Sequence, residues 1–379
     1  MVRVSVVGLA FLAALGITGS AGVFLLLSPA FVLLYLVGHR VPLGRRIFAF
    51  TQQLVQGMWL GNAAILMEKW QGIHVQVFLA DGSDAVKAQK DVAAILSGER
   101  AIWLSNHRTR LDWMLLWSFG LRIHALHQLK IILKASLKDV PIFGWAMQMF
   151  QFIFLTRHWQ NDQAYLNDVL EHLTTTAPNA SYLLFPEGTD LSASNLAKSN
   201  AFAATKGKPP RHFTLYPRTT GWTHIVPRVR HEIDAVYDLS MCFVDRVPGQ
   251  RANEPELLAG AMPKAMHIYV RRFPIADLPS DADGLNAWME ARYAEKEALL
   301  AEWYTHARPP ADACVILDHE LSSTTHLIQA FWVLLCAILL AALYSYSYMR
   351  LFVALLCLVH VTFAKMTTGV DRYLMTSSS

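Results

Sequence analysis

The stretch AIWLSNHRTRLDWMLLW, residues 101–117, joins an apolar run to a polar cluster and then to a second apolar run. AIWLS predicts a short buried strand, and LDWMLLWSFGLR, residues 111–122, predicts a helix with Asp112 in its first turn. His107 therefore falls in the loop between them. A strand leading directly into a helix is the unit of α/β folds, whose active sites gather at the carboxyl ends of the strands.

The spacing of His107 and Asp112 suits general base chemistry because a turn separates the two residues. On one continuous helix, residues five apart would diverge by about 140°. With a turn between them, the carboxylate can reach the imidazole, hold one tautomer and leave the other ring nitrogen free to accept a proton from a hydroxyl group. The alternative is that Asp112 only stabilises the helix N-terminus. The pair by itself does not decide between these interpretations.

A second polar cluster follows the apolar run YLLF of YLLFPEGTD, residues 182–190. Its members are Pro186, Glu187, Gly188, Thr189 and Asp190. Polar side chains at the carboxyl end of a strand suit the lip of an active site, and the glycine permits close approach of backbone to ligand. The alternative is an ordinary turn before a helix that Thr189 and Asp190 cap.

Two further stretches carry an arginine after an apolar run. FIFLTR ends at Arg157, whose guanidinium would suit a bidentate contact with phosphate. LYPRTTGW contains Pro217 and Arg218. Taken alone, either arginine is equally explained as a surface residue or a salt-bridge partner.

Short apolar runs alternate with helical patterns through the middle of the chain. The runs are HVQVFLA, AIWLS, KIILK, FIFLTR, YLLFP, DLSMCFV and MHIYVRRF. This alternation predicts βαβ units and hence an α/β fold with a mixed, mostly parallel sheet flanked by helices. After them, residues 280–304 predict a capped helix with a solvated charged face.

Long apolar segments near both ends predict membrane attachment. The chain has 379 residues, of which 54% are hydrophobic and only 16% charged. No charged residue lies between Val4 and Gly38, and a straight helix needs only about 20 residues to cross a bilayer. The predicted organisation is a membrane anchor, hairpin or kinked helix, at 1–40, a linking helix at 41–70, a catalytic domain at 71–310, a transmembrane hairpin at 325–366 and a polar tail at 367–379.

The alternatives for these segments are a cleaved signal peptide and a buried pair of core helices. The first apolar run is too long for a signal peptide and lacks a clear cleavage site. The second run has no polar alternation, which disfavours a core helix pair. Basic residues Arg3, Arg40, Arg45 and Arg46 flank the first segment, so both of its ends are expected in the cytosol.

The charge and the cysteines exclude several other classes of protein. The net charge is only +4 and the sequence contains no basic tract, so it does not predict a surface that binds nucleic acid. The four cysteines are scattered without metal spacing, as expected for buried thiols in a reducing compartment. His124 and His127 stand three apart without a third ligand, so packing explains them better than a metal. We expect neither a metal nor a bound cofactor.

The blocks NHRTRLD, FIFLTR, FPEGTD and LYPRTTGW, in this order, resemble the four sequence blocks of the glycerophospholipid acyltransferases, which include the lysophosphatidic acid acyltransferases. NHRTRLDWMLLW, LKASLKDVPIFGWAMQ, FPEGTDL and PRTTGW resemble the lysocardiolipin acyltransferase branch more closely still. The resemblance extends over residues 61–304. One departure is that Gln151 and Phe152 stand where many members have a glycine, which disfavours the simple lysophosphatidate group.

The resemblance implies a role for each block. His107 would be the base that deprotonates the free hydroxyl of a lysophospholipid, and Asp112 would orient it. The oxygen would attack the thioester of acyl-CoA, which is a co-substrate, without an acyl-enzyme stage. The implied acceptor and phosphate-binding residues are Arg157, Glu187, Gly188 and Thr189. The implied supporting residues are Asn106, Pro186, Pro217 and Arg218.

The expected function is acyl-CoA-dependent re-acylation of lysocardiolipin, lysophosphatidylinositol or lysophosphatidylglycerol. The alternative enzyme is a 1-acylglycerol-3-phosphate acyltransferase that makes phosphatidic acid, and the alternative of another class is an inactive lipid-binding membrane scaffold. A lipid hydrolase is disfavoured because the chain lacks GxSxG. Membrane lipids, acyl-CoA and the lysophospholipid are the expected partners. The expected location is the endoplasmic reticulum membrane with the catalytic domain facing the cytosol, or the inner membrane of a bacterium.

Overall fold

A computed structural model describes most of the chain. The described residues are 4–37, 41–246, 250–306, 309–310, 312–317, 325–366 and 369–376. The chain forms two compact units. The first unit comprises Met1–Leu9, Ala64–Ala125 and Pro178–Leu321, and the second comprises Ala10–Ala63, Leu126–Ala177 and Ser322–Ser379. Each unit is therefore built from segments that are separated along the chain. The flanking Arg3 and Arg40 lie outside the described residues.

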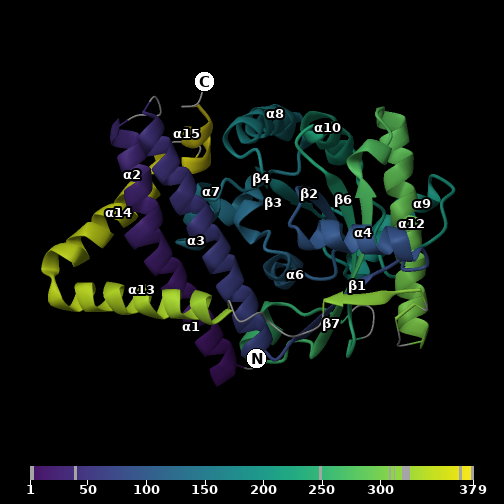
Figure 1. Ribbon diagram of the computed structural model, residues 1–379, viewed down its shortest axis with the longest axis horizontal. Helices are drawn as coiled ribbons and strands as arrows, with labels where there is room; N and C mark the ends of the chain where they lie inside the picture. Colours follow the sequence, from purple (N-terminus) through teal and green to yellow (C-terminus); the bar gives the residue numbers. More distant parts are fainter. Residues whose placement is uncertain are drawn as a thin grey trace. The chain divides into compact units, whose positions relative to one another are not determined.

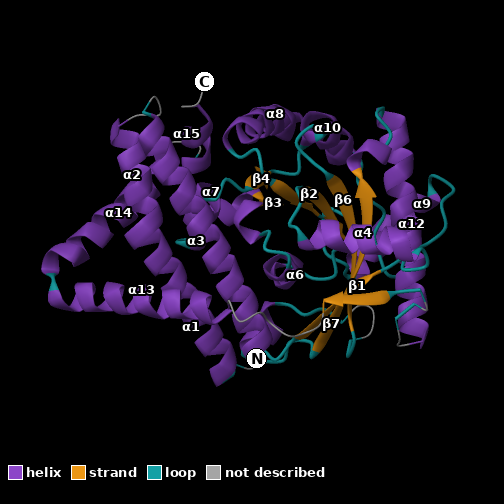
Figure 2. Ribbon diagram, in the orientation of Figure 1, coloured by secondary structure: helices purple, strands orange, loops and turns teal. Residues whose placement is uncertain are grey.

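The first unit contains a twisted sheet with the strand order β5-β2-β6-β7-β1-β8 (Figures 1 and 2). The strands are β1 (His74–Leu79), β2 (Ala101–Ser105), β5 (Ser181–Leu184), β6 (Ala235–Phe243), β7 (Ala265–Pro274) and β8 (Cys314–Leu317). β2 pairs in parallel with β5 and β6, and β1 pairs in parallel with β7. The pairs β6–β7 and β1–β8 are antiparallel. The predicted mixed, mostly parallel sheet flanked by helices is confirmed.

Burial explains why the central strands read as continuous apolar runs. Every residue of β2, β5 and β6 is buried, as expected for strands covered on both faces. Trp103 of β2 contacts the ring of Phe119, and Phe119 contacts Tyr237 of β6, with ring centroids 5.0 and 6.2 Å apart. These rings join the sheet to the helix that follows β2, so the core directly supports the loop between them.

Helices cover the sheet of the first unit, and α12 packs against β6. The helices are α4 (Ala85–Leu96), α5 (Asp112–Leu115), α6 (Trp117–Arg122), α9 (Ala193–Ala204), α10 (Thr220–Val229), α11 (Glu254–Ala259) and α12 (Ala282–His306). The helix expected at 111–122 is divided into α5 and α6 at Leu116, whose carbonyl accepts from both Phe119 and Gly120 N–H. Asp112 occupies the first turn of α5, as predicted.

The second unit consists mainly of helices with a short parallel strand pair. The strands are β3 (Leu129–Lys134) and β4 (Ile153–Leu155). The helices are α2 (Ser28–Val37), α7 (Phe143–Met149), α8 (Trp159–Thr176), α13 (Thr325–Ser345), α14 (Ser347–Met366) and α15 (Val370–Thr376). α1 (Val6–Gly22) and α3 (Pro42–Lys69) are divided between the two units.

Among the described residues, two helical stretches are long and apolar enough to cross a membrane. Val6–Val37 forms one helical run, with a π-helical turn at Val23–Leu27 just before Pro29. The turn fits the missing N–H of proline, which removes a regular helical hydrogen bond. The other stretch is Thr325–Ser345, only 11% of which is buried inside the protein. It meets α14 at a tight turn, yellow in Figure 1. Such exposed apolar surface indicates membrane association.

Candidate active site

Asn106 fixes the loop that follows β2. Its side-chain Nδ2 donates to the carbonyl of Met241 at 3.0 Å, and its Oδ1 accepts from the N–H of Met241 at 2.7 Å. The amide therefore makes the two hydrogen bonds that a backbone peptide would make to β6. Asn106 is fully buried, so neither bond competes with water. The next residue, His107, is held at the carboxyl end of β2.

His107 and Asp112 form a direct hydrogen-bonded pair. His107 Nδ1 lies 2.9 Å from Asp112 Oδ2, which also accepts from the backbone N–H of Thr109 at 2.9 Å. The imidazole stacks on Phe185 with ring centroids 4.5 Å apart. Because Nδ1 faces the carboxylate, Nε2 is the nitrogen left for exchange with a substrate proton. The pairing that the sequence left open is thus present in the fold.

Burial and mutual attraction act in opposite directions on this pair. Burial lowers the pKa of His107, but the hydrogen bond and charge of Asp112 outweigh it and hold that pKa above its ordinary value. Burial raises the pKa of Asp112, and the bond to His107 opposes that rise. The two groups therefore titrate as a unit in which the imidazole is a stronger base than free histidine.

Glu187 connects the loop after β5 to two other segments. Its Oε1 accepts from the backbone N–H of His107 at 2.8 Å, and its Oε2 accepts from the N–H of Leu215 at 2.9 Å. The side chain is buried, and burial raises the pKa of this carboxyl to about 7 despite the two N–H donors. Glu187 was expected to contact the acceptor. In the structure its two oxygens accept from backbone N–H groups, one of which is that of His107.

Gly188 and Arg218 lie directly against each other. Gly188 has φ +71°, and a Cβ at this position would stand 3.2 Å from Cδ of Arg218. The backbone N–H of Arg218 donates to the carbonyl of Pro186 at 2.8 Å, which brings the segment containing Pro217 to the same loop. Thr189 Oγ1 accepts from Asn195 Nδ2 at 3.1 Å. The segments carrying Pro186, Gly188, Thr189 and Arg218 therefore adjoin the His107 loop.

Arg157 belongs to the second unit. Its backbone N–H donates to Asp162 Oδ2 at 2.8 Å, and Thr156 donates to the other oxygen of the same carboxylate. Arg157 also has a positive φ of 68°. Asp162 lies in the first turn of α8, and its carboxylate holds the segment of Thr156 and Arg157 that leads into this helix.

A segment that the sequence did not single out also lies on the site loop. Arg251 forms an ion pair with Asp190, and Thr109 Oγ1 donates to the carbonyl of Ala252. Glu254, which begins α11, accepts from Arg110 Nη2 at 3.0 Å. These contacts join residues more than 60 positions apart, and no periodicity or motif in residues 250–254 predicts them.

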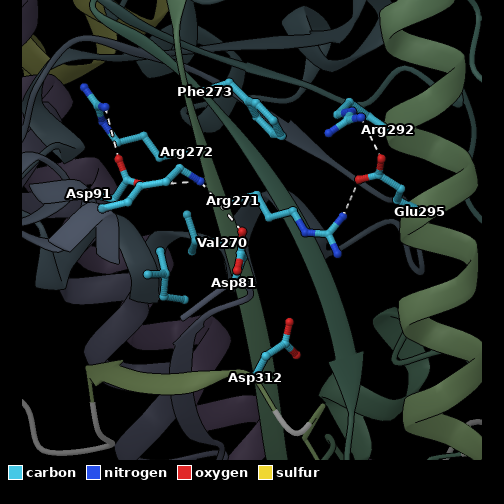
Figure 3. A pocket seen from close by; sticks show the side chains of 11 residues that line it. Asp81, Asp91, Val270, Arg271, Arg272, Phe273, Arg292, Glu295 and Asp312 are labelled. Atoms are coloured by element: carbon cyan, nitrogen blue, oxygen red, sulfur yellow. Dashed lines mark hydrogen bonds and ion pairs between the residues drawn. The ribbon is translucent and has the colours of Figure 1, made fainter. Parts of the chain in front are cut away.

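A separate pocket of about 370 Å³ lies on the first unit, away from these residues (Figure 3). It is lined by Leu79, Asp81, Lys87, Asp91, Val270, Arg271, Arg272, Phe273, Arg292, Glu295 and Asp312. Its cations are paired: Arg271 and Arg292 each lie 2.6 Å from Glu295, and Arg272 lies 3.2 Å from Asp91. None of the predicted site residues lines this pocket, and its neutralised arginines do not offer an anion site.

The sequence matches two related family profiles. Residues 83–243 match the family described as Acyltransferase, and residues 256–332 match Acyltransferase C-terminus. The chain is 39% identical over 287 residues to lysocardiolipin acyltransferase 1 of Danio rerio, covering 74% of this chain and 70% of the relative. It is 33% identical to the Mus musculus protein of the same name, with 86% of each chain covered. It is 33% identical to lysophosphatidylinositol acyltransferase 10 of Caenorhabditis elegans over 56% of this chain and 55% of the relative.

These matches include the His107 loop, the β5 loop and α12, whose residues make the contacts described above. The resemblance that the four sequence blocks suggested is therefore confirmed along the greater part of the chain. The protein belongs to the acyltransferase family and is an enzyme of that class.

Proposed function

We propose that this protein transfers an acyl group from acyl-CoA to the free hydroxyl of a lysophospholipid, with lysocardiolipin, lysophosphatidylinositol or lysophosphatidylglycerol as the acceptor. Relatives whose names specify lysocardiolipin or lysophosphatidylinositol support a phosphate-bearing lysolipid as the acceptor. The observation that carries the proposed chemistry is the 2.9 Å contact between His107 Nδ1 and Asp112 Oδ2. Because Nδ1 is hydrogen-bonded to the carboxylate, Nε2 is the ring nitrogen that can act as the base.

In the proposed mechanism, Nε2 of His107 removes the proton of the acceptor hydroxyl as its oxygen attacks the thioester carbonyl. Asp112 holds the tautomer and stabilises the imidazolium that forms. The carbon–sulfur bond breaks, CoA leaves as a thiolate, and the imidazolium returns the proton to the thiolate or to water. The thioester is already activated, so the chemistry calls for no metal and no acyl-enzyme.

The remaining predicted residues would bind or frame the acceptor. Arg218, which packs on Gly188, offers a guanidinium beside the His107 loop and suits the acceptor phosphate. We keep Arg157 and Thr189 as proposed phosphate-binding residues. For Glu187 we propose an indirect role, because its two oxygens already accept from backbone N–H groups.

A second candidate acceptor is 1-acylglycerol-3-phosphate. The chain is 29% identical to probable 1-acyl-sn-glycerol-3-phosphate acyltransferase 5 of Arabidopsis thaliana, with 89% of this chain and 87% of the relative covered. The test is an assay of the purified full-length protein with acyl-CoA and each of the four lysolipids. We expect the highest kcat/KM with one of the three larger headgroups, and a clear preference for 1-acylglycerol-3-phosphate would favour the second candidate.

The role of His107 is tested by His107→Ala, with His231→Ala as the matched control. His231 is an exposed histidine of the first unit, outside the candidate site. We expect the His107 variant to lose activity by a factor of about 10² to 10⁴, the range for loss of a general base, while the control keeps wild-type activity. Full activity in a folded His107→Ala protein would reject the mechanism, and an inactive wild type would favour the membrane scaffold.

We propose that the protein acts in the endoplasmic reticulum membrane with the first unit in the cytosol, or in an inner membrane if the source is bacterial. The apolar stretches Val6–Val37 and Thr325–Ser345 support membrane attachment, since acceptor and product are both lipids. Fractionation with organelle markers, followed by protease treatment of sealed membranes, tests this location. Protection of the first unit from added protease would contradict the cytosolic orientation.

A further inference from the structure

The segment from Arg211 to Arg218 reaches the candidate site without forming a helix or a strand. It lies between α9 and α10, and Thr214 and Leu215 within it are buried. Its backbone N–H groups therefore need partners outside any regular element. These partners are side chains of α9 and α12, the side chain of Glu187 and the carbonyl of Pro186.

One carboxylate of α12 holds the middle of this segment. Glu297 Oε1 accepts from the N–H groups of His212 and Phe213 at 2.5 and 3.0 Å. Its Oε2 accepts from the N–H and from the hydroxyl of Thr214, both at 2.8 Å. Successive N–H groups that point to one place form a concavity suited to an anion. In this protein the chain itself supplies the anion.

The segment is attached at two further places, one on each side of the stretch that Glu297 holds. At its start, Asn200 of α9 accepts from the N–H of Arg211 at 3.0 Å and donates to the carbonyl of the same residue at 2.8 Å. Beyond the stretch, the N–H of Leu215 donates to Glu187 at 2.9 Å. Glu297 therefore sets the path of the backbone between these two attachments.

Arg218 stands at the end of this path. Its side chain is exposed and lies against Gly188, and we propose its guanidinium for the acceptor phosphate. A guanidinium on a segment without regular structure has no helix or sheet of its own to fix its position. The side chains that hold the segment must therefore provide that position.

We propose that Glu297 is a positioning residue for acceptor binding, which fixes the backbone of residues 212–214 and through it Arg218. This inference rests on the proposed function, in which Arg218 binds the acceptor phosphate. Glu297 lies in residues 256–332, which match Acyltransferase C-terminus, whereas the predicted site residues lie in residues 83–243, which match Acyltransferase. The C-terminal region thus serves the reaction by holding a part of the acceptor site.

The experiment measures kcat and the KM of each substrate for full-length Glu297→Gln in detergent micelles, with acyl-CoA and the best acceptor of the four lysolipids. Glutamine replaces one carboxylate oxygen by an NH₂ group, which would face N–H donors. We expect KM for the lysolipid to rise about tenfold, the scale for hydrogen bonds to a charged group. Values of kcat and of KM for acyl-CoA should stay close to wild type, because His107 keeps its contacts with Asp112 and Glu187.

Glu295→Gln is the matched control for this substitution. Glu295 is a carboxylate of the same helix, two residues earlier, and it pairs with Arg271 and Arg292 at the separate pocket. Both KM values of this variant should equal those of the wild type. If Glu297→Gln does not fold, Thr214→Val takes its place, because it removes only the hydroxyl contact with the carboxylate. A smaller rise in KM for the lysolipid is then expected.

A double-mutant cycle with Arg218→Ala separates positioning from a general loss of structure. If Glu297 acts through Arg218, adding Glu297→Gln to Arg218→Ala should raise KM for the lysolipid no further. Any loss of thermal stability, by contrast, should be the same in both backgrounds. Hydrogen exchange provides a readout that needs no activity. The amides of residues 212–214 should exchange faster in Glu297→Gln than in wild type, and those of β2 at an unchanged rate.

Four results would overturn the inference. They are a wild-type KM for the lysolipid in folded Glu297→Gln or in the substitute Thr214→Val, a rise in KM for acyl-CoA instead, additive effects of the two substitutions in the cycle, and unchanged exchange at residues 212–214. An inactive wild type would reject the proposed function itself and the acceptor role of Glu297 with it. Faster exchange at residues 212–214 would distinguish that case, because it would show that Glu297 still holds the segment.

Discussion

The carboxylate of Glu187 accepts a hydrogen bond from the backbone N–H of His107 at 2.8 Å. The same side chain accepts from Leu215 N–H at 2.9 Å, so one buried carboxylate holds the loop after β2, the loop after β5 and the segment before α10. The backbone of His107 is therefore held by a residue that lies 80 positions away in sequence.

Glu187→Gln should weaken this connection. A glutamine offers one acceptor oxygen and one NH₂ group, so one of the two backbone N–H groups would face a donor. We expect a loss of about 1–3 kcal/mol, the usual cost of leaving a buried group unsatisfied, seen as lower kcat/KM and a lower thermal unfolding midpoint. The control is Glu290→Gln, an exposed carboxylate of α12. Wild-type values in Glu187→Gln would show that the connection is dispensable.

Gly188→Ala should distort the site in two ways. The φ of +71° is costly for alanine by about 1–2 kcal/mol, and the new Cβ would stand 3.2 Å from Cδ of Arg218. We expect lower stability and a higher KM for the lysolipid. Adding Arg218→Ala should relieve the contact but not the backbone cost. Gly221→Ala in α10 is the control, since nothing lies within 4 Å of that position. Equal stability of Gly188→Ala and wild type would contradict the expectation.

Lys296→Met should destabilise the first unit. Lys296 Nζ lies 2.6 Å from Asp238 Oδ1, with both side chains almost completely buried. Removing one partner leaves an uncompensated buried charge, at a cost of about 3–5 kcal/mol. The double variant with Asp238→Leu should recover most of the loss, because it removes the orphaned charge as well. The free energies of unfolding of the single and the double variant are measured in denaturant. Equal values for the two variants would rule out this explanation.

Lys130 of the second unit gives a pH dependence of stability. Burial lowers its pKa to about 7 from 10.5, and its Nζ donates to the Phe150 carbonyl at 2.7 Å. Between these two values the unfolded chain holds a proton that the folded chain has released, so the free energy of unfolding rises with pH in this window. The slope is about 1.4 kcal/mol per pH unit.

Lys130→Met should lack this contribution and be more stable than wild type at neutral pH. Unfolding free energies of both proteins at about pH 7 and about pH 9.5, a window inside the one derived above, provide the measurement. We expect the advantage of the variant to shrink as the pH rises. A constant difference between the two proteins across this window would mean that the lysine keeps its proton on folding.

Much of the site was predictable because its residues are close in sequence or follow strands. His107 and Asp112 are five residues apart across one turn, so local geometry alone allowed their contact, and the structure contains it. The apolar runs predicted buried strands, since parallel strands covered on both faces leave no room for polar alternation. The same reasoning placed the PEGT residues at the end of β5.

The role of Glu187 could not be predicted, because its partners are backbone N–H groups, which every residue but proline carries and which leave no mark in the sequence. The pairing of Arg251 with Asp190 likewise depends on how the segment before α11 returns to the sheet.

The sequence by itself therefore determined the class of fold, the family and the pair that we propose for catalysis, since hydrophobic periodicity and short-range spacing are local properties. Only the tertiary structure decided that Glu187 holds His107 and that Arg108 is buried against Tyr304. The physical reason is that burial, and with it the strength of each charge, depends on which distant segments cover a residue.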